Sequence, residues 1–272
     1  MKKVLITGAT GFIGKHVLNP LLENGFEIYP VKNIDLLNAN NIKKLFQEQK
    51  PNYLLHLAWE TTPSKYWNSE LNFEWVQASI EILKQFYKNG GGRAVFAGTC
   101  AEETSKTPYG TCKKALKEIA ESYCSLNNIS FAWGRIFFLY GSNENPKRLV
   151  PYVINNLLNN QEALCSDGQQ IRDFLHVQDV ANAFAEILNS DVNNIVEISS
   201  GESVKIADII NKIGEITGKQ ELIKLGYKKS SDTEPKIILG DNSKLKEIGW
   251  TPKYTIDQGL KETIDWWKNV AN

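Results

Sequence analysis

The sequence is poor in the residues that build disulfide frameworks and metal centres. It has four cysteines and three histidines in 272 residues. The cysteines lie far apart without a C-x-x-C pair, so we expect reduced thiols rather than cross-links. The histidines, His16, His56 and His176, are equally isolated, and we therefore predict no metal site. A G-x-S-x-G elbow is also missing, which argues against an α/β-hydrolase.

Excess charge and long apolar runs are absent as well. Lysine and arginine total 31, aspartate and glutamate total 31, and the formal net charge is zero. Because no charge excess attracts a polyanion, we expect no nucleic-acid partner. No apolar run approaches membrane-spanning length, and Met1-Lys2-Lys3-Val4 carries no apolar signal core. These absences favour a cytoplasmic protein with no membrane partner and a small ligand.

What the sequence does contain is a glycine-rich turn near its start, running from Thr7 to Gly14. The turn follows an apolar run at 3–6 and leads into 12–22, where apolar residues recur at helical spacing. In such a strand–turn–helix, glycines permit unusual backbone angles and close approach to a pyrophosphate, which the helix N-terminus then binds. The candidate cofactor-binding residues here are Gly8, Thr10, Gly11, Phe12, Ile13 and Gly14.

This turn has two other interpretations. A glycine turn that merely joins a strand to a helix stays open. A phosphate-binding P-loop does not fit, because Ala9 stands where that motif requires glycine and His16 follows Lys15 in place of serine or threonine.

Strand and helix patterns alternate along the chain. Apolar runs predict strands at 27–31, 53–57, 94–97, 131–138 and 195–198, and helical spacing predicts helices at 41–49, 69–87, 113–125, 148–159, 206–216 and 256–267. This alternation predicts an α/β fold, a Rossmann-type doubly wound parallel sheet with a smaller C-terminal lobe. We expect the dinucleotide-binding domain over 1–165, with 171–198 returning to it, and a substrate-binding lobe from 141–170 and 199–272.

A second motif, Tyr109-x-x-x-Lys113, lies where a predicted helix begins. Residues four apart share a helix face, so both side chains can meet over one ligand. A nearby ammonium can lower a tyrosine pKa by about 1–3 units, which would ease proton exchange. Thr99 follows a predicted strand and can hydrogen-bond a substrate oxygen. The alternative is that Thr99 caps a strand, Tyr109 starts a helix and Lys113 is a solvated charge.

Further segments accompany these motifs in order: His56-Leu57-Ala58, Arg135 with Tyr140-Gly141, Arg172-Asp173-Phe174 through Val180, and Gly249-Trp250-x-Pro252. Together they resemble, over nearly the whole chain, the extended short-chain dehydrogenase/reductases that act on nucleotide sugars, the NAD-dependent epimerase/dehydratases. The resemblance implies a bound NAD or NADP and a catalytic set at Thr99, Tyr109 and Lys113. It also implies that Lys113 holds the nicotinamide ribose.

The resemblance suggests further ligand contacts. For the cofactor these are Lys32, Asp35, Leu36, Leu57, Ala58 and Trp59, in addition to Tyr109 and Lys113. For the nucleotide-sugar substrate they are Thr99, Cys100, Phe138, Arg148 and Arg172. Three of these residues have a plainer alternative: Lys32 as a solvated charge, Cys100 as a packed thiol, and Arg172 as the ion-pair partner of Asp173 or Asp179.

Departures from the family pattern narrow the expected reaction. Cys100 and Ala101 stand where 4,6-dehydratases carry their Asp-Glu pair, although Glu102 and Glu103 follow closely. The short step through Lys32-Asn33-Ile34 and the aromatic Phe138 are similar to reductases of the dTDP-4-dehydrorhamnose type. We therefore expect reduction of a 4-keto nucleotide sugar for polysaccharide or glycoconjugate synthesis. A nucleotide-sugar epimerase with retained NAD, or a non-catalytic NAD(P) sensor or regulatory subunit, remains an alternative.

Cofactor choice and assembly follow from the same comparison. No acidic residue ends the second predicted strand to bind a ribose 2′-hydroxyl, while Lys32 can meet a 2′-phosphate, so NADPH is favoured over NADH. The predicted helices at 69–87 and 113–125 match those that pair across a two-fold axis in relatives. We therefore expect a homodimer.

Overall fold

The structure is a computed structural model that describes residues 2–229 and 234–271. It divides into two compact units. Unit 1 comprises Met1–Ile136, Ala181–Ile198 and Ser243–Trp250, and unit 2 comprises Phe137–Val180, Ser199–Asn242 and Thr251–Asn272. The division expected from the sequence differs from this one, because it extends the first domain to residue 165 and assigns 243–250 to the smaller lobe.

Unit 1 is built on a six-stranded sheet in the order β10-β5-β4-β3-β1-β2, and every neighbouring pair is parallel. The strands are β1 (Lys2–Thr7), β2 (Phe26–Pro30), β3 (Tyr53–His56), β4 (Arg93–Thr99), β5 (Ser130–Ile136) and β10 (Asn194–Ile198). Central strands such as β4 are buried along almost their full length, as a sheet covered on both faces requires. The predicted Rossmann-type sheet is confirmed.

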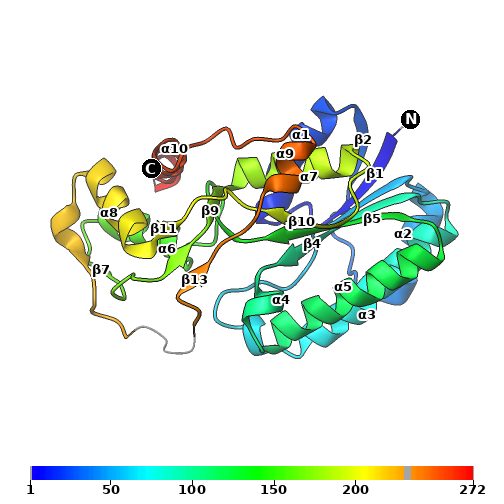
Figure 1. Cartoon of the computed structure of the whole chain (residues 1–272), viewed down its shortest axis with the longest axis horizontal. Helices are drawn as coiled ribbons and strands as arrows, with labels where there is room; N and C mark the ends of the chain where they lie inside the picture. Colours follow the sequence, from blue (N-terminus) through cyan, green and yellow to red (C-terminus); the bar gives the residue numbers. More distant parts are fainter. Residues whose placement is uncertain (1, 230–233, 272) are drawn as a thin grey trace. The chain divides into compact units, whose positions relative to one another are not determined.

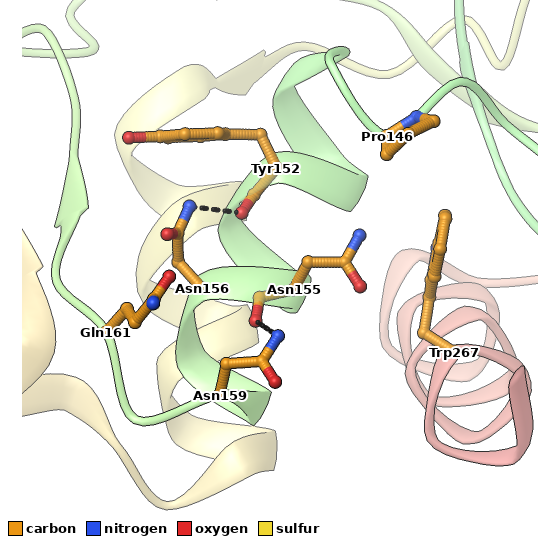
Figure 2. Close-up of a pocket in the computed structure, with 7 residues that line it drawn as sticks. All are labelled: Pro146, Tyr152, Asn155, Asn156, Asn159, Gln161 and Trp267. Carbon is orange, nitrogen blue, oxygen red and sulfur yellow. Dashed lines mark hydrogen bonds between the residues drawn. The ribbon is translucent and has the colours of Figure 1, made fainter. Parts of the chain in front are cut away.

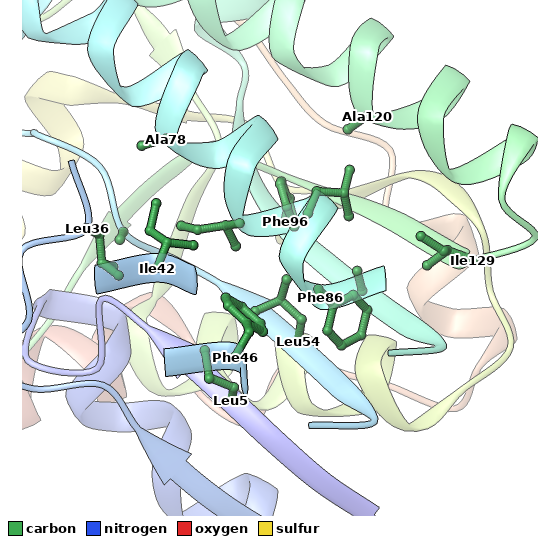
Figure 3. Packing of buried hydrophobic residues seen from close by; sticks show 14 of the residues in the cluster. Leu5, Leu36, Ile42, Phe46, Leu54, Ala78, Phe86, Phe96, Ala120 and Ile129 are labelled. Atoms are coloured by element: carbon green, nitrogen blue, oxygen red, sulfur yellow. The ribbon is translucent and has the colours of Figure 1, made fainter. Parts of the chain in front are cut away.

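Helices cover both faces of this sheet (Figure 1). One face carries α2, α3 and α5, and the other carries α1, α7 and α9. Their bounds are α1 (Phe12–Glu23), α2 (Ala39–Gln49), α3 (Leu71–Lys88), α5 (Pro108–Leu126), α7 (Val177–Asn189) and α9 (Ser243–Glu247). Under the α2–α3–α5 face, Leu5, Phe46, Leu54, Phe86 and Phe96 form part of one buried cluster (Figure 3). Burial of such side chains stabilises the fold by about 1.5–3 kcal/mol each.

The sheet ends at β2, because the segment that follows this strand is too short to add another strand outside it. In the commoner dinucleotide-binding order, 3-2-1-4-5-6, a further strand lies outside the second one. Here the chain passes from β2 to α2 through 31–38 with no helix or strand between them. The shortening predicted around Lys32-Asn33-Ile34 is therefore present, and β2 is an edge strand.

The first turn of α5 lies earlier than the sequence indicates. Thr107 caps the helix by accepting a hydrogen bond from the backbone N–H of Gly110, and Pro108 occupies the first turn. Both features are typical helix starts. Because the helix begins at Pro108 rather than at 113, Tyr109 and Lys113 both lie inside it and share a face.

Unit 2 packs three helices around its own core. These are α6 (Leu149–Leu158), α8 (Ile206–Thr217) and α10 (Ile256–Ala271), close to the predicted ranges. Its core includes Tyr140, Ile154, Leu157, Ile210 and Ile264. Short strands pair as β6 (Phe138–Tyr140) with β9 (Phe174–His176), β11 (Val204–Lys205) and β13 (Ile237–Ile238) with β8 (Ile171–Arg172), and β7 (Ala163–Leu164) with β12 (Ile223–Lys224).

Several elements differ from the expected ones. The strand expected over 131–138 is two strands, β5 and β6, separated at Phe137. Helix α7 and several short elements are absent from the prediction: η1 (Tyr66–Asn68), α4 (Ala101–Thr104), η2 (Gln220–Leu222), α9 and the strands β7, β8, β9, β11, β12 and β13. Within the described ranges, no helix has both the length and the hydropathy that crossing a bilayer demands.

Candidate functional site

The glycine turn between β1 and α1 forms a cradle that a larger residue would fill. Gly8 has φ +71°, and a Cβ added there would lie 2.7 Å from the backbone N of Ala58. A Cβ on Gly14 would lie 2.1 Å from the carbonyl oxygen of Gly8. Gly11 is the N-cap of α1 and offers no side-chain cap to the helix amides. The first amides of α1 thus lack a side-chain cap, and the glycines leave space for a ligand to approach the backbone of the turn. This arrangement is suited to a dinucleotide pyrophosphate.

His56 fixes the neighbouring ends of β1 and β3. Its Nδ1 lies 2.7 Å from the Thr7 hydroxyl and its Nε2 lies 2.8 Å from the Ser79 hydroxyl. The Thr7 hydroxyl also accepts the backbone N–H of Ala58 at 3.3 Å. Burial lowers the pKa of His56 to about 3, and the charge of Lys113 acts in the same direction. His56 is therefore neutral at physiological pH and serves as a structural link rather than a proton donor.

Thr99 and Tyr109 meet at the carboxyl end of β4. A side-chain hydrogen bond joins them, and the Tyr109 side chain is buried. Burial is the largest influence on the phenol and raises the pKa of Tyr109, while the bond to Thr99 opposes the rise. The predicted lowering of this pKa by Lys113 is wrong, because burial raises the pKa and the charges of Tyr66, Cys100 and Glu102 act in the same direction.

The Lys113 ammonium is held within the same unit by two contacts. It donates a hydrogen bond to the carbonyl oxygen of Ala97 at 2.9 Å, and it lies 3.9 Å from the centre of the Trp59 ring. Burial lowers the pKa of Lys113 to about 7, and the charge of Glu102 raises it. A cation over an indole face is stabilised by the ring quadrupole. Lys113 is therefore a buried, positioned amine rather than a solvated surface charge.

An aromatic cover, Trp59, Tyr66 and Trp67, packs around Tyr109. The ring centres of Tyr66 and Trp67 lie 4.8 Å and 5.5 Å from that of Tyr109, both edge to face. Asn72 ties the cover together, since it accepts from the Trp59 indole N–H at 2.9 Å and donates to the Tyr66 carbonyl at 2.7 Å. Sequence reasoning missed Tyr66, although adjacent aromatics in a loop after a strand end were an available signal.

The remaining candidate cofactor residues lie along the carboxyl edge of the sheet or just beyond it. Lys32 and Asp35 are exposed, and Asp35 accepts the backbone N–H of Leu37 at 3.0 Å. Leu36 is buried in the main core. Leu57 and Ala58 follow β3, as predicted, and Thr10, Phe12 and Ile13 lie in and after the glycine turn. Cys100 is buried at the N-cap of α4, where its N–H donates to the Ile136 carbonyl at 2.8 Å.

Unit 2 contains the other candidate substrate residues. Arg172 is buried, pairs with Glu234 at 3.3 Å and lies 5.3 Å from the centre of the Phe138 ring. Arg148 is the half-buried N-cap residue of α6. Unit 2 thus brings Arg172 and Phe138 together, and unit 1 brings Thr99, Tyr109, Lys113 and Trp59 together.

The two aspartates considered as partners of Arg172 hold backbone instead. Asp173 accepts the N–H groups of Ser200 at 2.7 Å and Gly201 at 2.9 Å. Asp179 accepts the N–H groups of Lys253 at 2.9 Å and Tyr254 at 3.1 Å. Charge-assisted bonds to backbone amides are strong and short. Both carboxylates therefore fasten chain segments of unit 2 that are far apart in sequence.

A pocket of about 280 Å³ lies on unit 2 (Figure 2). It is lined by Pro146, Tyr152, Asn155, Asn156, Asn159, Gln161 and Trp267, and none of these is a predicted site residue. The lining has no carboxylate, amine or imidazole, so it offers little for acid–base chemistry. Over the described ranges, no group of three or more histidine, cysteine or acidic side chains is arranged to hold a metal ion.

The chain matches a family model and several known proteins. The family model described as the NAD dependent epimerase/dehydratase family matches residues 4–199. The chain is 27% identical to a putative UDP-glucose 4-epimerase of Methanocaldococcus jannaschii, with 98% of each chain covered. It is 26% identical to CDP-abequose synthase of Salmonella typhimurium, covering 96% of this chain and 97% of that protein.

A solved structure shares the fold. It is UDP-glucose 4-epimerase of Thermus thermophilus in complex with NAD, which matches with a TM-score of 0.89 at 22% identity. The match covers 98% of this chain and 99% of that one. The resemblance found in the sequence is confirmed by these matches.

Proposed function

Because the chain belongs to the NAD dependent epimerase/dehydratase family, we propose that it is an NAD(P)-dependent oxidoreductase that reduces a 4-keto group on a nucleotide-linked sugar. The observation that carries this proposal is the buried, hydrogen-bonded pair of Thr99 and Tyr109, with Lys113 one turn further along α5. A pure binding module has no need of such a proton donor.

The ionisation of Tyr109 favours reduction over oxidation. Reduction of a ketone requires a protonated donor at the carbonyl oxygen, whereas oxidation of an alcohol requires a base. Burial raises the pKa of Tyr109 and so keeps its hydroxyl protonated at neutral pH. In this proposal Tyr109 donates its proton to the substrate oxygen, and the Thr99 hydroxyl hydrogen-bonds and orients that oxygen.

The glycine cradle fits a nicotinamide dinucleotide, and such a cofactor would supply the hydride. Gly8, Gly11 and the first amides of α1 would hold its pyrophosphate. By family resemblance, Lys113 would hold the nicotinamide ribose and Asp35 would lie by the adenine. The exposed Lys32 is suited to a 2′-phosphate, so we propose NADPH as the preferred cofactor.

The substrate class follows from the relatives and from unit 2. The relatives named above act on UDP-linked or CDP-linked sugars by their names. The forked donors of Arg172 and Arg148 suit the phosphate oxygens of such a substrate. Phe138, beside Arg172, offers an aromatic surface for it.

The proposal is tested by Tyr109→Phe, with Tyr227→Phe as the control because Tyr227 is 70% exposed. NADPH and NADH oxidation is followed with a panel of nucleotide 4-ketosugars. Loss of the general acid should lower kcat by about 100-fold or more. Dinucleotide affinity should stay within about threefold of wild type for both variants.

Other outcomes of the same assay decide against reduction. Interconversion of nucleotide sugars without net cofactor consumption would make the protein an epimerase. Dinucleotide binding without turnover by wild type, across a broad panel, would make it a sensor.

We also propose that the protein is a homodimer through α3 and α5. These two helices pack against each other and carry several exposed apolar side chains. Phe73 is 55% exposed, Tyr87 and Ile119 are each 41% exposed, and Leu126 is 81% exposed. Exposed apolar side chains on two adjacent helices favour burial against a second copy.

A further inference from the structure

The carboxylate of Glu102 is fully buried beside the candidate catalytic residues, with 0% of its side chain exposed. One oxygen accepts the backbone N–H of Thr99 at 2.6 Å and the indole N–H of Trp133 at 2.8 Å. The other accepts from Arg135 at 3.3 Å and 3.4 Å. Because protein donors occupy both oxygens, Glu102 is not placed to act as an acid or base on a substrate.

Gly98 in β4 leaves space for this carboxylate because glycine has no side chain. A Cβ added to Gly98 would lie 2.0 Å from the Trp133 indole nitrogen and 2.7 Å from a Glu102 oxygen. Any larger residue at this position of β4 would therefore break the bond between Trp133 and Glu102. The glycine, the indole and the carboxylate form one built arrangement under the end of β4.

Arg135 alone does not balance the negative charge of Glu102. Arg135 is shared among three carboxylates, those of Glu102, Glu103 and Glu197, at 3.1–3.3 Å. A buried carboxylate is costly unless its charge is matched. The second cation that acts on Glu102 is the buried Lys113, whose ammonium lies 5.9 Å from the Trp133 ring. Trp133 is thus a common neighbour of the carboxylate and the ammonium.

We propose that Glu102 is a positioning residue of the active site: it anchors the Thr99 backbone and serves as the buried counter-ion of Lys113. This inference rests on the proposed function for its catalytic consequence. Glu102 touches neither substrate nor cofactor in this role. It acts through Thr99, Lys113 and Tyr109.

The direction of its electrostatic effect follows from the surrounding charges. The negative charge of Glu102 raises the pKa of Lys113 and also that of Tyr109. Removing that charge should therefore lower both pKa values. The other titratable or charged groups that face this cluster are Arg135 from β5, Glu103 from α4, Glu197 from β10, His56 from β3, Tyr66 from η1 and Cys100.

Glu102→Gln keeps the shape of the side chain and removes its charge. Glu103→Gln is the matched control, because Glu103 lies in the same helix and pairs with the same Arg135 but is 47% exposed. Dinucleotide affinity is measured from pH 5.5 to 9.5 by titration calorimetry, which requires no turnover. The pH dependence of kcat/KM is measured over the same range with a ketosugar substrate.

In wild type, dinucleotide affinity should weaken as pH rises through the ionisation of Lys113, whose pKa lies at about 7. Glu102→Gln should move that midpoint down by about one unit, the lower end of the effect of a nearby opposite charge, because Arg135 shares the charge of Glu102. The alkaline limb of kcat/KM should move in the same direction. Glu103→Gln should leave both midpoints in place.

Glu102→Asp adds a test that keeps the charge but shortens the side chain. It should keep the pH midpoint and lower kcat, because the bond to the Thr99 N–H is stretched. The proposal is overturned if Glu102→Gln lowers affinity and kcat/KM equally at every pH, or changes neither, or if Glu102→Asp alone shifts the midpoint. A wild type without turnover would refute the proposed reduction, while the binding midpoints would still decide the role of Glu102.

Discussion

Gly14→Ala separates two opposite expectations about the glycine turn. Gly14 lies in the first turn of α1, and alanine is favoured over glycine in helix interiors by up to about 1 kcal/mol. Propensity alone therefore predicts a more stable protein. In the structure, however, an alanine Cβ would lie 2.1 Å from the Gly8 carbonyl oxygen and 2.7 Å from the Ala9 Cα. Both neighbours are backbone atoms, so the contact cannot be relieved by a side-chain rotation.

The magnitude follows from what must move. An ordinary contact needs about 3.4 Å, so the Gly8 carbonyl has to shift by more than 1 Å, and it accepts the Gly11 N–H at 2.9 Å. Overpacking costs about 1–3 kcal/mol and the lost hydrogen bond about 1 kcal/mol, and the helix-propensity gain of about 1 kcal/mol leaves a net loss of about 1–3 kcal/mol. For a chain of this size, that lowers the Tm by about 2–12 °C.

Thermal unfolding is measured for wild type, Gly14→Ala and Gly92→Ala, each with and without NADH. Gly92 is the control because a Cβ there would have nothing within 4 Å. Gly92→Ala should change stability by less than about 1 kcal/mol. Gly14→Ala should also weaken NADH binding by about tenfold, because the displaced turn misplaces its amides. A Tm at or above that of wild type, with unchanged NADH affinity, would refute the reasoning.

Two further changes test the cofactor and assembly proposals. Lys32→Ala should weaken NADPH binding by about fivefold, the effect of about 1 kcal/mol from one exposed charge, and leave NADH binding unchanged; equal losses for both cofactors would rule out a 2′-phosphate contact. Ile119→Glu on α5 should convert a dimer to monomer in analytical ultracentrifugation, whereas Leu22→Glu on α1, 52% exposed, should not. A monomeric wild type would eliminate the dimer proposal.

Much of the fold was accessible from the sequence because its elements carry strong local signals. The apolar run before Gly8 and the helical spacing after Gly11 predict β1 and α1 within two residues of their observed ends. The short path from β2 to α2 was also predictable, because few residues separate the second predicted strand from the next predicted helix. Helix α7 was missed because it follows directly on β9, with no loop between the strand and the helix to mark the change of period at Val177.

The site was only partly accessible, for a physical reason. Spacing predicts that Tyr109 and Lys113 share a helix face, since that depends on local geometry alone. The partners of these residues come from elsewhere in the chain: Trp59 lies under the ammonium, Tyr66 packs on the phenol, and Glu102 supplies a charge. No periodicity encodes such tertiary neighbours.

The pKa of Tyr109 shows what those neighbours change. A tyrosine beside a solvated ammonium would ionise more easily, which suits a base that oxidises an alcohol. In the structure the aromatic cover and the fold around it bury the phenol, and its pKa rises. A buried phenol rests in its protonated form, whereas acting as a base would first require loss of that proton. The same burial that hides the site from sequence analysis therefore sets the resting protonation state of Tyr109, and this is the state from which the proposed ketone reduction begins.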